Sequence, residues 1–351
     1  MPKWFDSLEG ATGRSVLSLP GSLLRVLSGG TKKNDEGAAL NPAIQMGLLL
    51  ARIHKATEDL EPPRARSELA RLTGFFDLPA EPLARVENFS IPGLQGHRIP
   101  VRLYSALRDN RMRSAMIYFH GGGFVIGDLN SNDAMLRSVA ARSGLSIVSV
   151  DYRLAPESPY PAGAEDAWAA YQWFQKHGNE LGLNPGSMGV GGDSAGGNLA
   201  IHVSLMAKKK RIRSPEFQAL IYPWVDLGDS AIADSSMIEL ASGYGLTGAM
   251  LDYFRRHSFQ TGTNFDDPML SPVKASRSAL KALPPTLIQL CGFDPLRDQG
   301  RRFGALIQEA GGEVNIKNYD SLIHGSISLA GTIKEARSMI DDLAQFLEVW
   351  V

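Results

Sequence analysis

The stretch MGVGGDSAGGN, residues 188–198, places five glycines around one serine, Ser194, with an acid, Asp193, directly before it. Glycine adopts positive φ readily and lets other backbone approach closely, but it lowers stability inside regular helices and strands. So many glycines on both sides of one hydroxyl therefore predict a turn with a strict geometric requirement at Ser194.

The flanking residues indicate which turn this is. The segment SMGV (187–190) is strand-like, and NLAIHVSLMAKKK (198–210) is helix-like. A strand, Gly-x-Ser-x-Gly and a helix form a nucleophile elbow, which holds its serine in strained geometry at the tip of a sheet. Gly192 and Gly196 then need to lack side chains because the turn packs them together. A phosphate-binding turn is the alternative, but the strand–turn–helix context favours Ser194 as a nucleophile.

Strand-like and helix-like segments alternate on both sides of this turn. Apolar strands joined by helical crossovers are typical of a mostly parallel sheet with helices on both faces, so we predict an α/β fold. The predicted strands cover residues 97–106, 114–123, 145–157, 187–190, 217–225, 285–293 and 313–320.

Two segments are expected to lie outside the sheet. Asn41 and Pro42 are typical of a helix start, in a helical unit that follows a Gly/Ser-rich leader. We therefore predict an N-terminal arm and helical cap over residues 1–80. A catalytic domain over residues 81–351 follows, with a polar, helix-prone cap insertion at about 226–265.

Composition excludes several classes of function. The chain has 351 residues, 44% hydrophobic and 21% charged, and a net charge of −1. Nothing therefore indicates nucleic acid or an anionic membrane as the main partner. The single cysteine, Cys291, excludes a disulfide framework, and no Cys/His cluster of metal-site spacing is present. Asp6 and Glu9 come early, and no apolar run reaches the roughly 20 residues of a membrane span, so we expect a cytoplasmic protein.

A serine nucleophile needs a base, and residue order selects one of the seven histidines. In the α/β-hydrolase arrangement the acid and then the base follow the serine along the chain. His202 lies only eight residues after Ser194, inside a predicted helix, and His257 lies in a basic stretch of the insertion. His324 follows the last predicted strand, and we predict it as the base.

The acid is expected at the end of the preceding strand. Asp294 directly follows the apolar segment TLIQLCGF (286–293), and Pro295 fixes the turn after it. Asp298 is the alternative, but four residues further on it is better placed as a charge at the start of the next helix. Asp294 is therefore predicted to bind the Nδ1–H of His324 and to stabilise the imidazolium.

Three glycines after another buried strand complete the predicted site. In HGGGF (120–124), backbone without side chains can turn its N–H groups toward a developing oxyanion, joined by the N–H of Ala195. We predict Gly122, Gly123 and Ala195 as the oxyanion hole, in which each donor is worth about 3–4 kcal/mol. His120 is expected to order this loop.

Five motifs in one order resemble the hormone-sensitive-lipase-like family of α/β-hydrolases, also called bacterial family IV esterases. They are HGGGF (120–124), DYRLAPESPYPA (151–162), GDSAGG (192–197), DPLRD (294–298) and HG (324–325). The resemblance implies a carboxylesterase of the GDSAG subgroup that acts on short- to medium-chain acyl esters. It also implies an α/β-hydrolase fold with a helical cap and no metal or cofactor.

Two features depart from the family pattern. Ser326 stands where the family usually has Phe, which is expected to loosen the packing around the catalytic loop. The leader of about 38 residues is longer than usual, and it extends the cap or mediates self-association, for example in a dimer; the sequence leaves both open.

Two rival functions use the same fold. Plant gibberellin receptors resemble the family but lack the catalytic histidine, whereas this chain keeps all three triad positions. Amidase or lactonase activity is not separated from esterase activity by the sequence, because pocket shape and leaving-group protonation decide between them.

Overall fold

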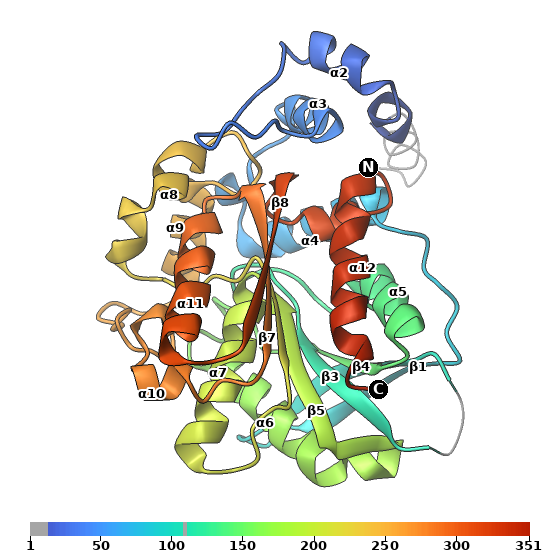
Figure 1. Ribbon diagram of the computed structural model, residues 1–351, viewed down its shortest axis with the longest axis vertical. Helices are drawn as coiled ribbons and strands as arrows, with labels where there is room; N and C mark the ends of the chain where they lie inside the picture. Colours follow the sequence, from blue (N-terminus) through green and yellow to red (C-terminus); the bar gives the residue numbers. More distant parts are fainter. Residues whose placement is uncertain (1–12, 108–110) are drawn as a thin grey trace.

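The protein is organised around an eight-stranded sheet (Figure 1). The structure, a computed structural model, describes residues 13–107 and 111–351. The strands are β1 Arg85–Pro92, β2 Arg98–Ser105, β3 Arg113–Phe119, β4 Ser146–Val150, β5 Leu183–Asp193, β6 Gln218–Ile221, β7 Thr286–Phe293 and β8 Val314–Ile323. Their order is β1-β2-β4-β3-β5-β6-β7-β8. The pairs β1–β2 and β2–β4 are antiparallel, and the other neighbours are parallel, which confirms the predicted α/β fold.

Helices cover both faces of the sheet, and each face has its own apolar core. One face carries α5 (Asp133–Ser143) and α12 (Lys334–Glu348), which pack against each other (Figure 1). The other carries α6 (Ala162–His177), α7 (Ala195–Lys210) and α11 (Arg297–Ala310). Within residues 13–107 and 111–351, no helix is both long enough and apolar enough to cross a membrane.

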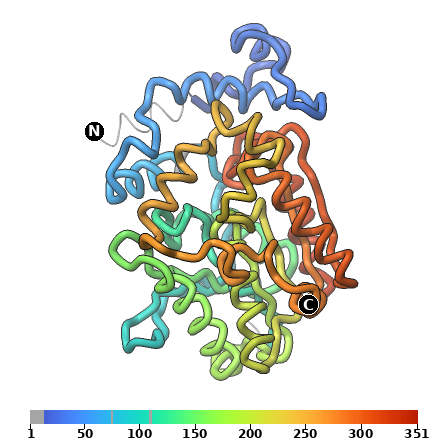
Figure 2. Tube along the Cα trace, turned by 90° about the vertical axis from the view of Figure 1, so that its left-hand side faces the viewer, coloured from blue at the N-terminus to red at the C-terminus, as the bar shows by residue number. Residues whose placement is uncertain are grey.

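The remaining longer helices gather around the carboxyl ends of the strands. They are α2 Gly21–Leu27, α3 Pro42–Ala51, α4 Pro62–Phe76, and the inserted α8 Ser235–Leu240 and α9 Gly248–Ser258. A further short helix, α10 Arg277–Leu280, lies before β7. As predicted, Asn41 begins α3, its side-chain oxygen accepting hydrogen bonds from the N–H groups of Ala43 (2.9 Å) and Ile44 (3.2 Å). In both views the segment that contains α2 and α3 forms the outermost layer at this end (Figures 1 and 2).

A third apolar core joins the N-terminal helices to the insertion. Ala65 of α4 lies in one buried cluster with Leu251 and Phe254 of α9 and with Trp224, which follows β6. The two predicted cap segments therefore pack on each other over the end of the sheet. The boundaries of the predicted domains stay predictions, and residues 1–12 of the arm lie outside the described residues.

Strand β1 is a difference from the sequence-based expectation, which begins the sheet at residue 97. The strand lies at the edge of the sheet and pairs only with β2. Ile91 is its one buried residue. An edge strand with so little burial lacks the apolar alternation by which strands are recognised in a sequence.

The glycines of the opening stretch allow the turn after β5 to approach β3. A β-carbon on Gly196 would overlap the carbonyl oxygen of Phe119, the last residue of β3. A β-carbon on Gly192 would overlap the backbone of Gly196. The predicted reason for these two glycines is therefore present in the structure, as a close contact between backbone and backbone.

Replacing Gly196 with alanine is expected to destabilise the protein by at least about 3 kcal/mol, because the added β-carbon meets backbone that cannot move aside. Gly47→Ala is the matched control in another helix, where the nearest neighbour of the added β-carbon is Leu17 Cδ2 at 3.9 Å. That change is expected to stabilise by about 0.5–1 kcal/mol. Urea unfolding followed by circular dichroism measures the free energy of unfolding of both variants. If Gly196→Ala and Gly47→Ala changed it equally, the close contact at Gly196 would be contradicted.

Candidate active site

Ser194 is held in a strained conformation at the junction of β5 and α7. It is the N-cap residue of α7, with φ 54° and ψ −118°. A non-glycine residue in such a conformation costs of order 1–3 kcal/mol and persists only where its surroundings fix it. Here its N–H donates to the carbonyl of Ile221 (2.8 Å), and its carbonyl accepts from the N–H of Trp224 (3.1 Å). The end of β6 therefore holds both sides of the serine.

The structure brings His324 and Asp294 to this serine from two other strand ends. His324 follows β8, and its Nε2 lies 3.0 Å from Ser194 Oγ. Its Nδ1 lies 2.8 Å from Oδ2 of Asp294, which follows β7 and is fully buried. The other carboxylate oxygen, Oδ1, accepts from the N–H of Leu296 (2.8 Å). The Tyr222 ring packs beside the imidazole, with 4.5 Å between ring centroids.

Ser326 closes the turn that carries His324. Its side chain is fully buried, and its Oγ accepts a hydrogen bond from the N–H of Ile323 (3.1 Å). Gly325, between His324 and Ser326, has φ 81°. The resemblance suggested that a serine here loosens the packing; the contacts instead show a buried hydroxyl that ties the turn together.

Asp193, the acid noted before the serine, anchors the glycine loop. Its buried Oδ1 accepts hydrogen bonds from the N–H of Gly121 (2.8 Å) and from the hydroxyl of Tyr118 (2.7 Å). Burial raises the pKa of Asp193, and these two hydrogen bonds act in the opposite direction. The sequence marked this acid by its position without indicating that it binds the loop.

The loop itself presents backbone N–H groups without partners. Gly122 and Gly123 have φ of 112° and 60°. Within residues 13–107 and 111–351, the N–H groups of Gly122, Gly123 and Ala195 donate no backbone or side-chain hydrogen bond. A β-carbon on Gly123 would overlap the ring of Phe254 on α9, so α9 lies directly against this loop.

The other histidines that the sequence analysis considered have structural surroundings. His120 is buried, with Nδ1 2.7 Å from the carbonyl oxygen of Gly121, and it stacks on Tyr152 at 4.4 Å between centroids. His202 lies within α7, and its Nδ1–H donates to the carbonyl of Met269 (3.3 Å). His257 is half-buried on α9.

Residues of the N-terminal arm support the loop that carries Asp294, which the sequence did not indicate. The side-chain amide of Asn34 donates to the carbonyl of Gly292, at the end of β7 (3.0 Å). The same carbonyl accepts from Arg297, whose guanidinium is almost fully buried and pairs with Asp35 (3.1 Å) and Asp298 (2.8 Å). Asp298, the rejected alternative acid, is thus an ion-pair partner in the first turn of α11.

A second arm contact supports the loop that carries His324. The N–H of Asn41 donates to the carbonyl of Ser321 near the end of β8 (2.9 Å). The arm therefore bonds to both strands that lead to the acid and the histidine. In the described part of the chain, no group of three or more His, Cys, Asp or Glu side chains is arranged to hold a metal ion.

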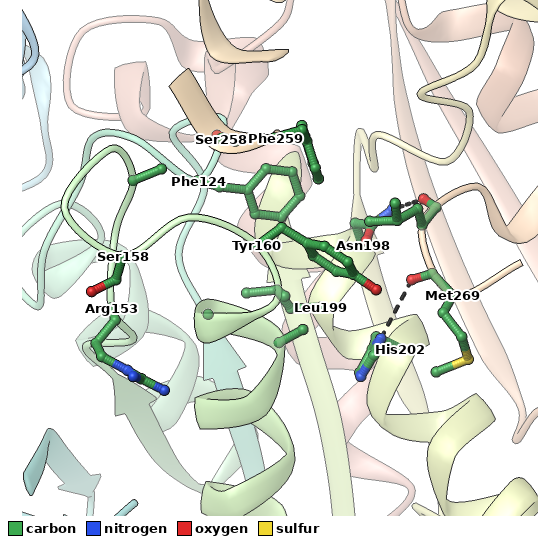
Figure 3. A pocket seen from close by; sticks show the side chains of 14 residues that line it. Phe124, Arg153, Ser158, Tyr160, Asn198, Leu199, His202, Ser258, Phe259 and Met269 are labelled. Atoms are coloured by element: carbon green, nitrogen blue, oxygen red, sulfur yellow. Dashed lines mark hydrogen bonds between the residues drawn. The ribbon is translucent and has the colours of Figure 1, made fainter. Parts of the chain in front are cut away.

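A pocket lies beside the first two turns of α7 (Figure 3). Phe124, Tyr160 and Phe259 form aromatic walls, and Asn198 and His202 line it from α7. None of the side chains of Ser194, Asp294 and His324 is among its lining residues. It nevertheless adjoins the site through Phe124, which follows Gly123, and through Asn198, whose N–H donates to the carbonyl of Ser194 (3.3 Å).

A serine after β5, a buried aspartate after β7 and a histidine after β8, all at the carboxyl ends of parallel strands, resemble the arrangement of an α/β-hydrolase with a Ser-His-Asp triad. The sequence matches the family described as alpha/beta hydrolase fold over residues 116–328. The chain belongs to this family, in its hormone-sensitive-lipase-like branch, as the motifs indicated.

Its relatives include proteins named as ester hydrolases. The carboxylic ester hydrolase LipN of Mycobacterium tuberculosis is 34% identical over 93% of this chain and 88% of its own length. The ethyl acetate hydrolase of Pseudomonas putida is 30% identical over 79% of this chain and 86% of its own length. A solved structure of a hyperthermophilic esterase from Pyrobaculum calidifontis superposes with a TM-score of 0.82 at 33% identity, over 88% of this chain and 98% of that one.

The buried His202 makes stability depend on pH. Burial lowers the pKa of its imidazole from 6.5 to about 4. Below pH 6.5 the unfolded chain therefore binds a proton that the folded protein does not bind, so stability falls as the pH drops from 6.5 toward 4. Between pH 7.5 and pH 5 this one group is expected to remove about 2 kcal/mol.

Urea unfolding at the two pH values, for wild type and His202→Gln, measures this contribution. The loss between pH 7.5 and pH 5 is expected to be smaller in His202→Gln by about 2 kcal/mol, since glutamine does not titrate. His257→Gln, at a half-buried position on α9, is the control. If wild type and His202→Gln lose the same stability, His202 is protonated in the folded protein at pH 5.

Proposed function

We propose that this protein is a carboxylesterase, a serine hydrolase in which Ser194, His324 and Asp294 form the catalytic triad. The observation that carries the proposal is the continuous path from Ser194 Oγ to His324 Nε2 (3.0 Å) and from His324 Nδ1 to Asp294 Oδ2 (2.8 Å). The membership of the family, and the names of relatives that cover most of the chain, support ester hydrolysis as the reaction.

In the first half-reaction Ser194 Oγ attacks the ester carbonyl carbon while His324 Nε2 takes the hydroxyl proton. Asp294 accepts the Nδ1–H of the histidine, which fixes its tautomer and stabilises the imidazolium that forms. Collapse of the tetrahedral intermediate breaks the bond to the alcohol oxygen, and His324 returns the proton to that oxygen. An acyl-enzyme ester on Ser194 and a free alcohol remain.

In the second half-reaction water repeats the attack on the acyl-enzyme. His324 removes a proton from the water, and the hydroxide equivalent adds to the acyl carbon. The proton then returns to Ser194 Oγ as the ester bond breaks, which releases the carboxylic acid and restores the free serine. No cofactor is needed to balance either half.

The oxyanion in both halves is assigned to the N–H groups of Gly122, Gly123 and Ala195. These groups are without partners among the described residues, and they lie on the two backbone segments that meet at Ser194. Ala195 is the first residue of α7, so the positive end of the helix dipole adds to its N–H. Removing one donor of this kind costs roughly 3–4 kcal/mol of transition-state stabilisation.

The pocket beside α7 supports short to medium acyl chains as substrates. Its lining residue Phe124 directly follows the proposed oxyanion loop, and the rings of Phe259 and Tyr160, 5.6 Å apart between centroids, form part of its wall. We assign this pocket to the acyl chain of the ester. The rings on its walls favour a short chain over a palmitoyl chain.

Ser194→Ala is expected to lower the kcat for hydrolysis of p-nitrophenyl butyrate by roughly 10⁴-fold or more, because the nucleophile is lost. Ser204→Ala is the matched control: Ser204 is a buried serine on the same helix, bonded to Gln218 (3.0 Å). That variant is expected to retain activity. Turnover by a folded Ser194→Ala protein at the wild-type rate, or no turnover by wild type, would overturn the proposed mechanism.

With p-nitrophenyl esters from acetyl to palmitoyl, kcat/KM is expected to be highest for short to medium chains and lowest for palmitoyl. Phe259→Ala is expected to shift the optimum to longer chains, because it lengthens the pocket. Phe346→Ala, a half-buried aromatic on α12 at the opposite face of the sheet, is the control for general loss of packing. An optimum that is the same in wild type and Phe259→Ala would place the acyl chain elsewhere.

A further inference from the structure

A small hairpin of the N-terminal arm lies between α2 and α3. Lys33 and Ala39 form an isolated antiparallel bridge. Inside this bridge the side-chain oxygen of Asn34 accepts from the N–H of Ala38 (2.9 Å), and the N–H of Asn34 donates to the carbonyl of Ala38 (3.1 Å). These bonds close the segment that we call the arm hairpin, residues 33–41. Its side chains are therefore presented from a backbone that is held by its own contacts.

The arm hairpin is bound to both strands that lead to the proposed acid and base. The buried side-chain amide of Asn34 donates to the carbonyl of Gly292 (3.0 Å), two residues before the proposed acid. The N–H of Asn41 donates to the carbonyl of Ser321 (2.9 Å), three residues before the proposed base. One short segment therefore holds the end of β7 and the end of β8 at the same time.

The two strands touch each other at the residue that Asn34 binds. The pairing of β7 with β8 shifts its register between Cys291 and Phe293, on either side of Gly292. A β-carbon on Gly292 would lie 2.2 Å from the carbonyl oxygen of Asp320 on β8, so backbone meets backbone there. The hydrogen bond from Asn34 therefore fixes β7 at a point of direct contact with β8.

Apolar packing joins the arm hairpin to the same two strand ends. Leu40 is fully buried, and it lies in one apolar cluster with Phe293 and Ile323. Phe293 directly precedes Asp294, and Ile323 directly precedes His324. The hairpin thus shares a core with the residues from which the acid and the base extend.

The carboxylate of Asp294 keeps the orientation of its loop. Its Oδ1 accepts from the N–H of Leu296 within that loop (2.8 Å), and its Oδ2 lies 2.8 Å from Nδ1 of the histidine. The far end of the loop is held by Arg297, whose guanidinium donates to the carbonyl of Gly292 (3.1 Å) and pairs with Asp35 of the arm hairpin (3.1 Å). Both ends of the loop therefore depend on the hairpin.

We propose that the arm hairpin positions Asp294 against His324, with Asn34 as a positioning residue that acts through the carbonyl of Gly292. In a Ser-His-Asp triad the aspartate acts by holding the Nδ1–H of the histidine, so its place relative to the ring decides its effect. A misplacement of about 1 Å in such a group can cost about 100-fold in rate. The inference rests on the proposed ester hydrolysis, because it assigns Asn34 a part in that reaction.

The kinetics of Asn34→Ala with p-nitrophenyl butyrate test the proposal. We expect kcat to fall at least about tenfold, because the acid loses its fixed place, and KM to stay within about twofold, because Asn34 does not line the pocket. Asn184→Ala is the matched control. The Asn184 side chain also accepts a turn N–H, from Gly186 (2.9 Å), but it lies at the amino end of β5. This variant is expected to keep the wild-type kcat.

A double-mutant cycle with Asp294→Asn separates positioning of the acid from general support of the fold. Asp294→Asn alone is expected to lower kcat roughly 10⁴-fold and to leave a measurable residual rate. If Asn34 acts through the acid, adding Asn34→Ala to this variant lowers kcat by less than about a further twofold. The same tenfold loss with and without the acid would overturn the proposal, since Asn34 would then act independently of Asp294.

Asn34→Ser provides a second variant in case Asn34→Ala does not fold. A serine hydroxyl can replace the turn bond to the N–H of Ala38, but its side chain is one bond shorter and does not reach the carbonyl of Gly292. Circular dichroism and urea unfolding identify the folded variants, and kcat is compared among these. Wild-type kcat in a folded Asn34 variant contradicts the inference and leaves the proposed function intact. Absence of turnover by the wild type contradicts both.

Discussion

The arrangement of this protein depends on one close contact between two backbone segments, the end of β3 and the turn after β5. Gly196 lies so near the Phe119 carbonyl that no side chain fits between them. Phe119 directly precedes the glycine loop, and Gly196 follows Ser194 by two residues, so this one contact fixes the serine relative to the loop. The Asp193 carboxylate adds a second link, since it accepts a hydrogen bond from Gly121 N–H. Backbone therefore positions the nucleophile more than any side-chain packing does.

The acid and the base depend on a different kind of support. The loop of the acid is held through the carbonyl of Gly292, which accepts hydrogen bonds from Asn34, far away in the chain, and from Arg297, five residues further on. Burying the guanidinium of Arg297 is costly, and its pairs with Asp35 and Asp298 offset that cost only while the arm stays in place. Residues of the arm are thus part of the structure around Asp294.

The sequence was sufficient to predict the fold and to predict that Ser194, Asp294 and His324 lie close together, because the carboxyl ends of parallel strands meet at one edge of the sheet. Strand β1 was not predicted, because an edge strand with one buried residue has little apolar alternation. The contact between Asn34 and Gly292 could not be predicted, because it joins segments far apart in the chain. Ser326 was noted as a departure from the family pattern, but its hydrogen bond to the N–H of Ile323 was not predicted. The pocket residues were not predicted either, because Phe124 and Phe259 are far apart in the chain and meet only after the insertion folds onto the sheet.

The contact between Gly123 and Phe254 gives α9 a direct part in the shape of the glycine loop. The ring of Phe254 on α9 occupies the space that a side chain at residue 123 would fill, so it forms one wall of the glycine loop. Any outward movement of α9 takes this wall away. The position of α9 and the space beside the glycine loop are consequently coupled.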